Sequence, residues 1–190
     1  MEEKIKLGNI EIPKPRKIVY DILKYKKGGT VLDLGCAYGR NSLFLSYNGF
    51  KVTSIEKEKN KIEWLRENSK KLGLKIQTHI SNIEDFVFDM EYDVIVATMV
   101  LHFLSAEKIV KTIPMMQKFT NRNGLNVITV YTDKNPIGIR EYLFKENELK
   151  NYYSNWNILE YEEYLGEKME NPKDGGPERR YIAKLIAKKI

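Results

Sequence analysis

The stretch Val31–Asn41 decides the fold of this chain and reads Val-Leu-Asp-Leu-Gly-Cys-Ala-Tyr-Gly-Arg-Asn. A short apolar run, with Asp33 near its end, is followed by Gly35 and Gly39 and then by a segment that favours a helix. Glycine lets the backbone approach a ligand closely, and a helix N-terminus behind such a loop favours an anionic group. The stretch therefore predicts a buried strand, a ligand-binding loop and a helix, which together open an α/β fold.

The spacing of the glycines argues against two common classes of ligand loop. The dinucleotide fingerprint Gly-x-Gly-x-x-Gly is not met, because Ala37 stands between Gly35 and Gly39 where that pattern has its second glycine. A phosphate-binding loop ends in Gly-Lys-Ser/Thr, whereas Arg40 follows the last glycine here. The spacing therefore disfavours NAD, and a phosphate-binding loop is excluded.

S-adenosylmethionine suits the loop better, because it carries a cationic amino group and a sulfonium but no phosphate. Asp33 would be electrostatically favourable beside these cations. The helix N-terminus after Gly39 can receive the methionine carboxylate, with help from Arg40. We assign the backbone of Gly35, Cys36 and Ala37 to the same loop. An ordinary strand–helix turn also contains glycine, and Cys36 itself is expected to be a small buried residue rather than a nucleophile.

Further polar residues follow the next predicted strands. Glu56 lies about 20 residues beyond the glycine loop, where a carboxylate can accept both ribose hydroxyls, and Lys57 stands beside it. Asn82 can bind the adenine amino group, and Ile83 can cover the ring. Thr98, at the end of the fourth strand, is expected near the transferred methyl group. Each of these would alone be an ordinary surface or turn residue, and their joint spacing indicates a nucleoside site.

Strand and helix patterns alternate along the rest of the chain and predict one mainly parallel, doubly wound sheet. Strands are predicted at residues 30–34, 51–55, 75–80, 92–97, 125–131, 157–165 and 180–188, and helices at 16–26, 40–48, 57–73, 105–119 and 146–153. The last two strands are joined too tightly for a helical crossover, so they should form an antiparallel hairpin. Residues 1–190 are expected to be one domain, and residues 1–15, which end at Pro13 and Pro15, an N-terminal arm and candidate lid.

The composition is that of a globular protein, with 190 residues, 42% hydrophobic and 31% charged. The net charge of +6 arises from basic residues interleaved with acidic ones, as in Glu56-Lys57-Glu58-Lys59, which indicates a solvated surface rather than nucleic-acid binding. The positive net charge also suits an anionic small substrate. A single cysteine allows no internal disulfide, and we expect no metal site. Without an apolar run that could span a membrane or form a signal peptide, we expect a cytoplasmic protein, either monomer or dimer.

The chain resembles the class I S-adenosylmethionine-dependent methyltransferases, and more closely the tellurite-resistance methyltransferases, a family that acts on small molecules. The resemblance covers roughly residue 16 to the C-terminus and rests on Leu32-Asp33-Leu34-Gly35-Cys36, Gly39-Arg40-Asn41-Ser42-Leu43, Asn48-Gly49-Phe50, Phe144-Lys145-Glu146, Tyr152-Tyr153, Trp156 and Gly166-Glu167. It implies the Rossmann-like fold of class I methyltransferases. It also implies that Asp33, Gly35, Gly39 and Glu56 hold S-adenosylmethionine.

The chain departs from this family at several places. Ala37 stands where the family commonly has glycine, and Asn82 stands where an aspartate is usual. We expect both departures to leave cofactor binding intact. His102 occupies a position that is often apolar, and residues 168–180 do not align cleanly with a polar stretch that carries His and Arg in the family. The identity of the methyl acceptor is therefore left open.

Three classes of function fit these observations. The first is methyl transfer to a small nucleophile that is anionic or soft, such as a tellurite- or selenite-like oxyanion or a thiol. The second is methyl transfer to RNA or protein. Against an amino-directed nucleic-acid enzyme, the sequence after the fourth strand reads Thr98-Met99-Val100-Leu101 instead of Asp/Asn-Pro-Pro-aromatic. The third is a cofactor-binding module without catalysis.

Catalytic and substrate-binding residues are the least determined by sequence. His102 is the only credible general base, but its apolar neighbours Leu101 and Phe103 favour a packing role. We expect that no dedicated base is needed. The substrate mouth is predicted from residues 13–17, 132–140 and 167–180, with Arg140 as the candidate substrate residue, although a plain surface charge explains Arg140 equally well.

Overall fold

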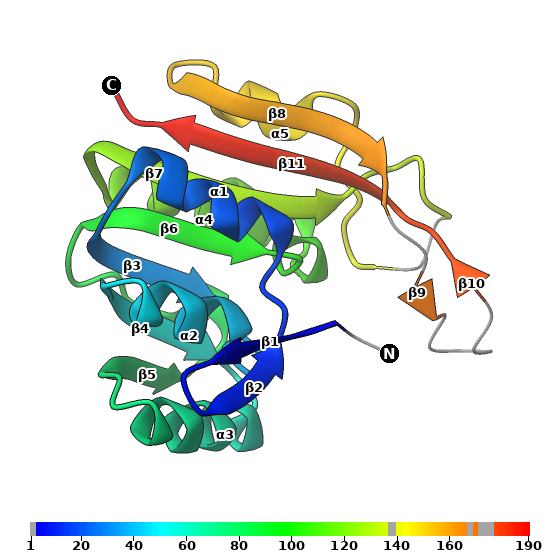
Figure 1. Cartoon of the computed structure of the whole chain (residues 1–190). Helices are drawn as coiled ribbons and strands as arrows, with labels where there is room; N and C mark the ends of the chain where they lie inside the picture. The colour runs from blue at the N-terminus through cyan, green and yellow to red at the C-terminus, as the bar shows by residue number, and fades with distance from the viewer. Residues whose placement is uncertain (1–2, 137–139, 167–168, 171–176) are drawn as a thin grey trace.

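The computed structural model describes residues 3–136, 140–166, 169–170 and 177–190 of the chain. Its centre is a seven-stranded sheet in the order β5-β4-β3-β6-β7-β11-β8 (Figure 1). The strands are β3 (Gly29–Leu34), β4 (Phe50–Glu56), β5 (Ile76–Ile80), β6 (Tyr92–Thr98), β7 (Thr120–Tyr131), β8 (Asn157–Leu165) and β11 (Tyr181–Lys188). Each predicted strand is present.

Strand directions confirm the mainly parallel sheet. β5, β4, β3, β6 and β7 pair in parallel, and β11 is antiparallel to both β7 and β8. The chain runs outward from β3 to β5 and then returns to β6 on the other side of β3. The order therefore reverses between β3 and β6, and an open α/β sheet binds ligands at the carboxyl ends of the strands beside such a switch point.

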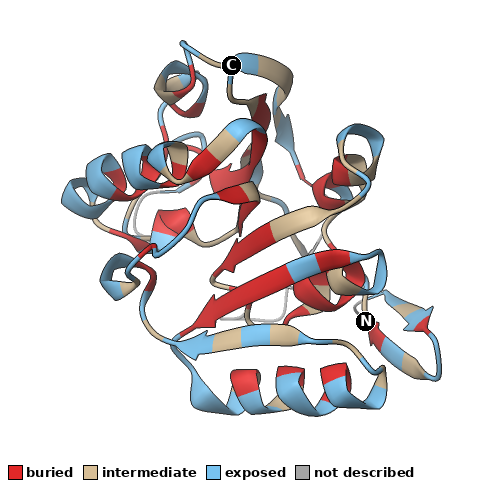
Figure 2. Ribbon diagram, turned by 90° about the vertical axis from the view of Figure 1, so that its left-hand side faces the viewer, coloured by how far each residue is buried: buried red, intermediate tan, exposed pale blue. Residues whose placement is uncertain are grey.

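Helices cover both faces of the sheet because each face is apolar. The helices are α1 (Lys17–Tyr25), α2 (Arg40–Tyr47), α3 (Lys59–Lys71), α4 (Ala106–Lys118) and α5 (Glu148–Tyr152). On one face α1 and α2 pack against Val31, Val94 and Val127, with α3 beside α2. The central strands are buried along most of their length, whereas the helices expose their outer sides (Figure 2).

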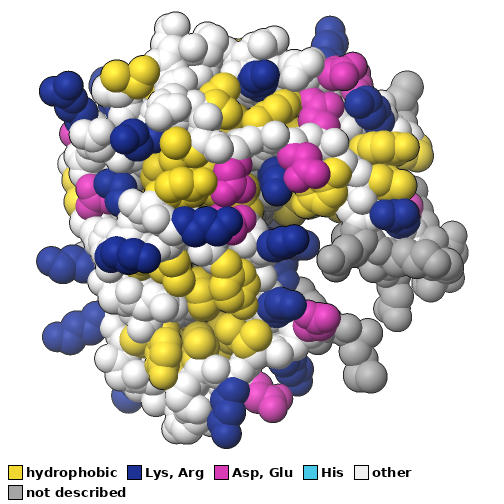
Figure 3. All heavy atoms as spheres, turned by 45° about the horizontal axis from the view of Figure 1, so that its top comes forward, with side chains coloured by type: hydrophobic (Ala, Val, Ile, Leu, Met, Phe, Trp, Pro, Cys, Tyr) yellow, Lys and Arg dark blue, Asp and Glu magenta, His cyan; other side chains and the backbone are white. Residues whose placement is uncertain are grey.

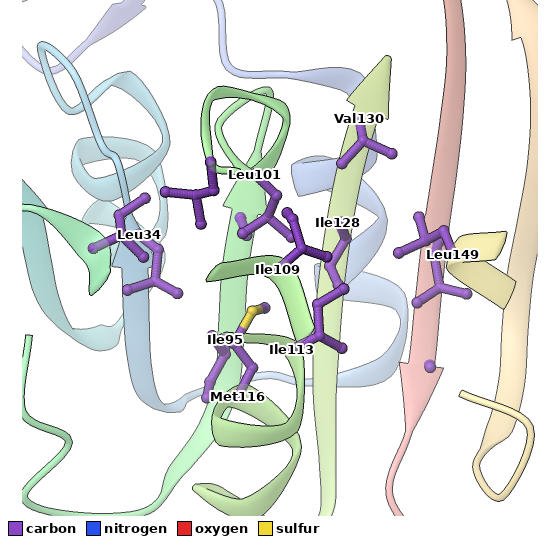
Figure 4. Close-up of a cluster of buried hydrophobic side chains, with 14 of the residues drawn as sticks. Leu34, Ile95, Leu101, Ile109, Ile113, Met116, Ile128, Val130 and Leu149 are labelled. Carbon is purple, nitrogen blue, oxygen red and sulfur yellow. The ribbon is translucent and has the colours of Figure 1, made fainter. Parts of the chain in front are cut away.

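The opposite face is covered by α4 and α5. In α4, Ile109, Ile113 and Met116 recur at helical spacing and point toward Ile95 and Ile128 of the sheet (Figure 4). Ser105 occupies the N-cap position of α4, but its side chain makes no capping hydrogen bond. None of the helices in the described part of the chain is long and apolar enough to cross a membrane.

The N-terminal arm contains structure that the sequence pattern did not predict. Strands β1 (Lys4–Leu7) and β2 (Ile10–Pro13) form an antiparallel hairpin. Leu7 and Ile12 of this hairpin are buried against α2, α3 and Cys36 of the glycine loop. The other elements that the prediction missed are short: the 3₁₀ turns η1 (Ile83–Asp85) and η2 (Leu101–Phe103), and the two-residue strands β9 (Met169–Glu170) and β10 (Pro177–Glu178).

Candidate cofactor site

The loop between β3 and α2 requires glycine for packing as well as for backbone shape. Gly35 and Gly39 both have left-handed backbones, with φ of 65° and 73°. A Cβ atom on Gly35 would collide with the side chain of Val100, and one on Gly39 would collide with Leu65. The close approach at these two glycines is thus to the protein's own side chains, which the sequence pattern could not reveal.

Ala37 adopts the left-handed backbone, with φ of 50°, that glycine would adopt without strain. Its N–H group donates to Glu56 Oε2 over 3.0 Å, which ties the loop to the end of β4. Glu56 Oε1 accepts a second hydrogen bond, from the N–H group of Glu58, over 3.1 Å. Each carboxylate oxygen has a further acceptor position, so Glu56 can still accept two ribose hydroxyls. Lys57, predicted beside the cofactor, is exposed.

Asp33 is buried near the end of β3, with 1% of the residue exposed. Ser42 Oγ donates to its Oδ2 over 2.5 Å, and Ser54 Oγ donates to Ser42 Oγ over 2.9 Å. Burial raises the pKa of Asp33 to about 7, although the Ser42 hydrogen bond and the Arg40 charge lower it. A bound cation nearby would favour the ionised carboxylate, so this residue fits the positive charges of S-adenosylmethionine.

Cys36 fills a small apolar space, as the sequence predicted. It is 5% exposed and packs with Leu7, Ile12 and Leu43. Burial raises the pKa of its thiol well above the usual value, which makes it a poor nucleophile. Its N–H group donates to Ile55 O over 2.9 Å and joins the loop to β4.

The loop after β5 presents polar groups beside the same edge. The Ser81 N–H group donates to Glu56 O over 3.1 Å, so the ends of β4 and β5 are joined. Asn82 is exposed and its Nδ2 donates to Asp85 Oδ2 over 2.8 Å, which leaves the amide oxygen for an adenine amino group. Ile83 is buried behind it. A surface groove lined by Arg66 and His79 lies beyond β5, on the outer edge of the sheet, and we do not assign the cofactor to it.

Asn41 lies at the candidate site, although its sequence position did not single it out. Its Nδ2 donates to Thr98 Oγ1 over 2.9 Å, and its Oδ1 accepts from the Arg16 N–H group over 3.2 Å. Arg40 Nη1 donates to Lys14 O over 3.5 Å. The glycine loop, the carboxyl end of β6 and the segment before α1 therefore meet at one place. A polar residue in the first turn of a helix is ordinary in sequence, and only its burial marks Asn41 as special.

His102 has the packing role that its apolar neighbours predicted. It is 1% exposed, its ring stacks on Tyr131 at 4.4 Å, and its Nδ1 accepts from the Tyr131 N–H group over 3.2 Å. Burial, together with the charges of Arg140 and Arg16, lowers the pKa of His102 to about 3. The imidazole is therefore neutral at physiological pH, with its proton on Nε2.

Arg140, the candidate substrate residue, packs against aromatic side chains. The Arg140 guanidinium lies 4.8 Å from the centre of the Phe103 ring and 5.2 Å from that of Tyr131, beside His102. Arg179, by contrast, donates to Gly166 O over 2.7 Å, and Arg180 pairs with Glu178, so both hold their own segment together. Residues 137–139, 167–168 and 171–176 of the predicted mouth lie outside the described residues.

Comparison with known proteins finds relatives along most of the chain. The family model described as "Tellurite resistance protein TehB" matches residues 9–183. The probable S-adenosyl-L-methionine-dependent methyltransferase TehB of Haemophilus influenzae (strain 10810) is 39% identical over 174 residues, which cover 90% of this chain. The match takes in 61% of that relative, so the chain spans about three fifths of its length.

Solved structures show the same fold. The crystal structure of TehB from Haemophilus influenzae superimposes with a TM-score of 0.87 at 37% identity, covering 93% of this chain and 63% of that chain. An S-adenosylmethionine-dependent methyltransferase from Methanosarcina mazei reaches a TM-score of 0.73 at 18% identity, covering 93% of this chain and 99% of that one. The fold is that of the class I methyltransferases.

Proposed function

The chain belongs to the family of the tellurite resistance protein TehB, and from this premise we propose that it transfers a methyl group from S-adenosylmethionine to a small nucleophile, either an oxyanion or a thiol. One observation carries the cofactor assignment. Asp33, the glycine loop and Glu56 meet at the switch point of the sheet, joined by the hydrogen bond from Ala37 to Glu56. This arrangement offers acceptors for a ribose and a buried carboxyl for a cation.

The bound cofactor supplies a methyl group on a positively charged sulfur. The chain's own residues then have three tasks. Glu56 orients the nucleoside through its free acceptor positions. The ionised carboxylate of Asp33 stabilises the positive charge of the bound cofactor. Thr98 marks the carboxyl end of β6, where we place the transferred methyl. Positioning and exclusion of water supply most of the catalysis of an in-line displacement, so no acid or base is required beyond these groups.

The acceptor side of the site carries positive charge. Arg140 lies over two aromatic rings beside the neutral His102, and the protein as a whole has a net charge of +6. A soft anion arrives already deprotonated, so it needs orientation and positive potential rather than a base. On the face shown in Figure 3, lysine and arginine side chains are dispersed among acidic and hydrophobic ones, which suits a small acceptor better than a nucleic-acid chain.

Transfer of an isotope-labelled methyl group tests this function. The protein is incubated with labelled S-adenosylmethionine and, separately, with tellurite, selenite, small thiols, total RNA and denatured protein. We expect label in volatile or small-molecule products from at least one of the first three. Label in the RNA or protein fraction alone would favour the second class of function, and cofactor binding without any transfer would favour a binding module.

A further inference from the structure

The segment between β6 and α4 lies directly against the glycine loop. Thr98 Oγ1 accepts a hydrogen bond from Asn41 Nδ2 over 2.9 Å. Val100 lies so close to Gly35 that a Cβ atom on that glycine would collide with it. Between them, Met99 has a left-handed backbone with φ of 57°, which a residue other than glycine adopts at a cost in free energy. This strained segment therefore lies where we expect the transferred methyl group.

The ring of His102, in the η2 turn of the same segment, is fixed in one orientation. It stacks on the Tyr131 ring at 4.4 Å between centres and lies 4.8 Å from the centre of the Phe103 ring. The Tyr131 N–H group donates to Nδ1 over 3.2 Å, and because an amide N–H group can only donate, Nδ1 carries a lone pair. Burial lowers the pKa of His102 to about 3, so the ring is neutral and its one proton lies on Nε2.

The Nε2–H group of His102 donates to no group among the residues that the structure describes. His102 is 1% exposed, so solvent does little to replace the missing partner. Nearly all buried N–H groups are paired, and an unpaired one destabilises the fold, whereas an apolar side chain would fill the same space without this cost. A donor that the fold leaves unpaired beside the glycine loop is available to a small ligand.

We propose that the Nε2–H group of His102 donates a hydrogen bond to the methyl acceptor and so orients it. As the acceptor atom forms its bond to the methyl carbon, the carbon–sulfur bond breaks and its electron pair remains on the sulfur. The acceptor uses one lone pair in this attack, so His102 must face another. Oxygen, sulfur and selenium atoms each have a second lone pair for this contact. This inference rests on the proposed function, because it requires an acceptor beside the cofactor.

Calorimetry with sodium selenite as the probe tests the contact. The protein is first saturated with S-adenosylhomocysteine, and selenite is titrated into wild type, His102→Met and His102→Gln. Methionine fills the space of the ring without a donor, whereas glutamine keeps both an acceptor for the Tyr131 N–H group and an N–H donor. We expect His102→Met to weaken selenite binding by about tenfold, and His102→Gln by clearly less.

The other histidine of the chain gives the matched control. His79 lies on β5 and is exposed, so His79→Met should leave selenite binding unchanged. Thermal unfolding of each variant checks that it is folded.

NMR of protein labelled in its two histidines tests the donor without any substitution. In the S-adenosylhomocysteine complex we expect the His102 ring to carry its proton on Nε2 and none on Nδ1. Addition of selenite should shift the Nε2–H signal, while the signals of His79 stay in place at the same ionic strength. Because this measurement uses the wild-type protein, it decides the question even if His102→Met does not fold.

Four outcomes would overturn the inference. The first is unchanged selenite binding in folded His102→Met, and the second is an equal loss in His102→Met and His102→Gln, which would assign the loss to packing. The third is a proton on Nδ1, or an Nε2–H signal that selenite does not shift. The fourth is wild-type protein that binds S-adenosylhomocysteine but not millimolar selenite. Failure of the wild type to bind S-adenosylhomocysteine at all would instead remove the proposed function.

Discussion

Glu56 joins two loops at the end of β4, which makes it the sharpest single-residue test of the cofactor site. Glu56→Ala should weaken S-adenosylmethionine binding by about 1–3 kcal/mol, because the ribose hydroxyls would lose their acceptor. Glu56→Gln keeps the shape and one oxygen, so it should lose less. Calorimetry on folded protein measures both, with the exposed Glu67→Ala on α3 as the control. An alanine variant with wild-type affinity would place the ribose elsewhere.

Asp33 should make cofactor binding depend on pH. Its pKa of about 7 lies above the usual value because of burial, so the free protein holds a proton there at pH 6. A cationic ligand favours the ionised carboxylate, and binding at low pH must first release that proton. We therefore expect S-adenosylmethionine affinity to rise between about pH 6 and pH 8. In Asp33→Asn the rise should disappear, and a variant that keeps it would assign the dependence to another group.

His102 should not behave as a general base. Because its pKa is lowered to about 3, the imidazole stays neutral across the working range and its Nδ1 is occupied by Tyr131. His102→Ala should retain most of kcat, although it leaves a cavity that lowers stability. Steady-state kinetics on the folded variant measure kcat and test this prediction. A fall in kcat of about 10²-fold or more, the scale of a lost base, would contradict it.

The pKa shifts of Asp33 and His102 have opposite consequences for folding. Asp33 is protonated in the native state up to about pH 7, so its contribution to stability is largest at low pH and is lost as pH rises to 7. His102 stays neutral when the unfolded chain would bind a proton, so its contribution is lost as pH falls below about 6.5. Between about pH 4 and pH 6.5 a rise in pH therefore lowers the contribution of Asp33 to the free energy of unfolding and raises that of His102.

The candidate site residues that sequence could single out are those whose proposed role depends on local spacing. Asp33, Gly35 and Glu56 follow from the order of strand, loop and strand, and the structure brings them together. Asn41 and Arg16 could not be predicted in this way. Their contact depends on how the entry to α1 packs against α2, and neither residue type is unusual at its position in sequence.

At the scale of elements, the long apolar strands and helices were predictable and the N-terminal hairpin was not. Its two strands have four residues each, and only Leu7 and Ile12 among them are buried, so the apolar positions give too little periodic signal. β7 also begins earlier than predicted, at Thr120 instead of Leu125. Thr120 can be buried at the start of the strand because its Oγ1 accepts a hydrogen bond from Asn126 Nδ2.

The hairpin should contribute to stability and to the shape of the cofactor loop. Ile12 is fully buried against α2, α3 and Cys36, so Ile12→Ala should lower the free energy of unfolding by about 2–5 kcal/mol. The exposed neighbour Glu11→Ala should change it by less than about 0.5 kcal/mol. Urea unfolding measures the free energy of unfolding of both variants. Equal effects would mean that the hairpin packs only loosely on the domain.

For the whole molecule, the relevant properties are the net charge of +6 and the position of Arg140 over the Phe103 ring, where we propose that the acceptor binds. If the acceptor is an anion, kcat/KM should fall several-fold between about 0.05 M and 0.5 M salt, because salt screens the attraction. The value of kcat should change little, since bound acceptor is shielded from the solvent. The test compares the salt dependence of kcat/KM for an anionic and a neutral acceptor. Equal salt effects on both would exclude attraction of the acceptor by charge.

The place of β11 between β7 and β8 has a consequence for how the chain folds as it is made. β7 can pair with β6 when it leaves the ribosome, but β8 has no neighbour until residues 181–188 follow. At the usual rates of synthesis that delay is on the order of one to five seconds, during which the edges of β7 and β8 are both open to other chains. Insertion of β11 pairs the open edge of β7 and one edge of β8 in one step, so a chaperone that covers nascent strands would be most needed in that interval.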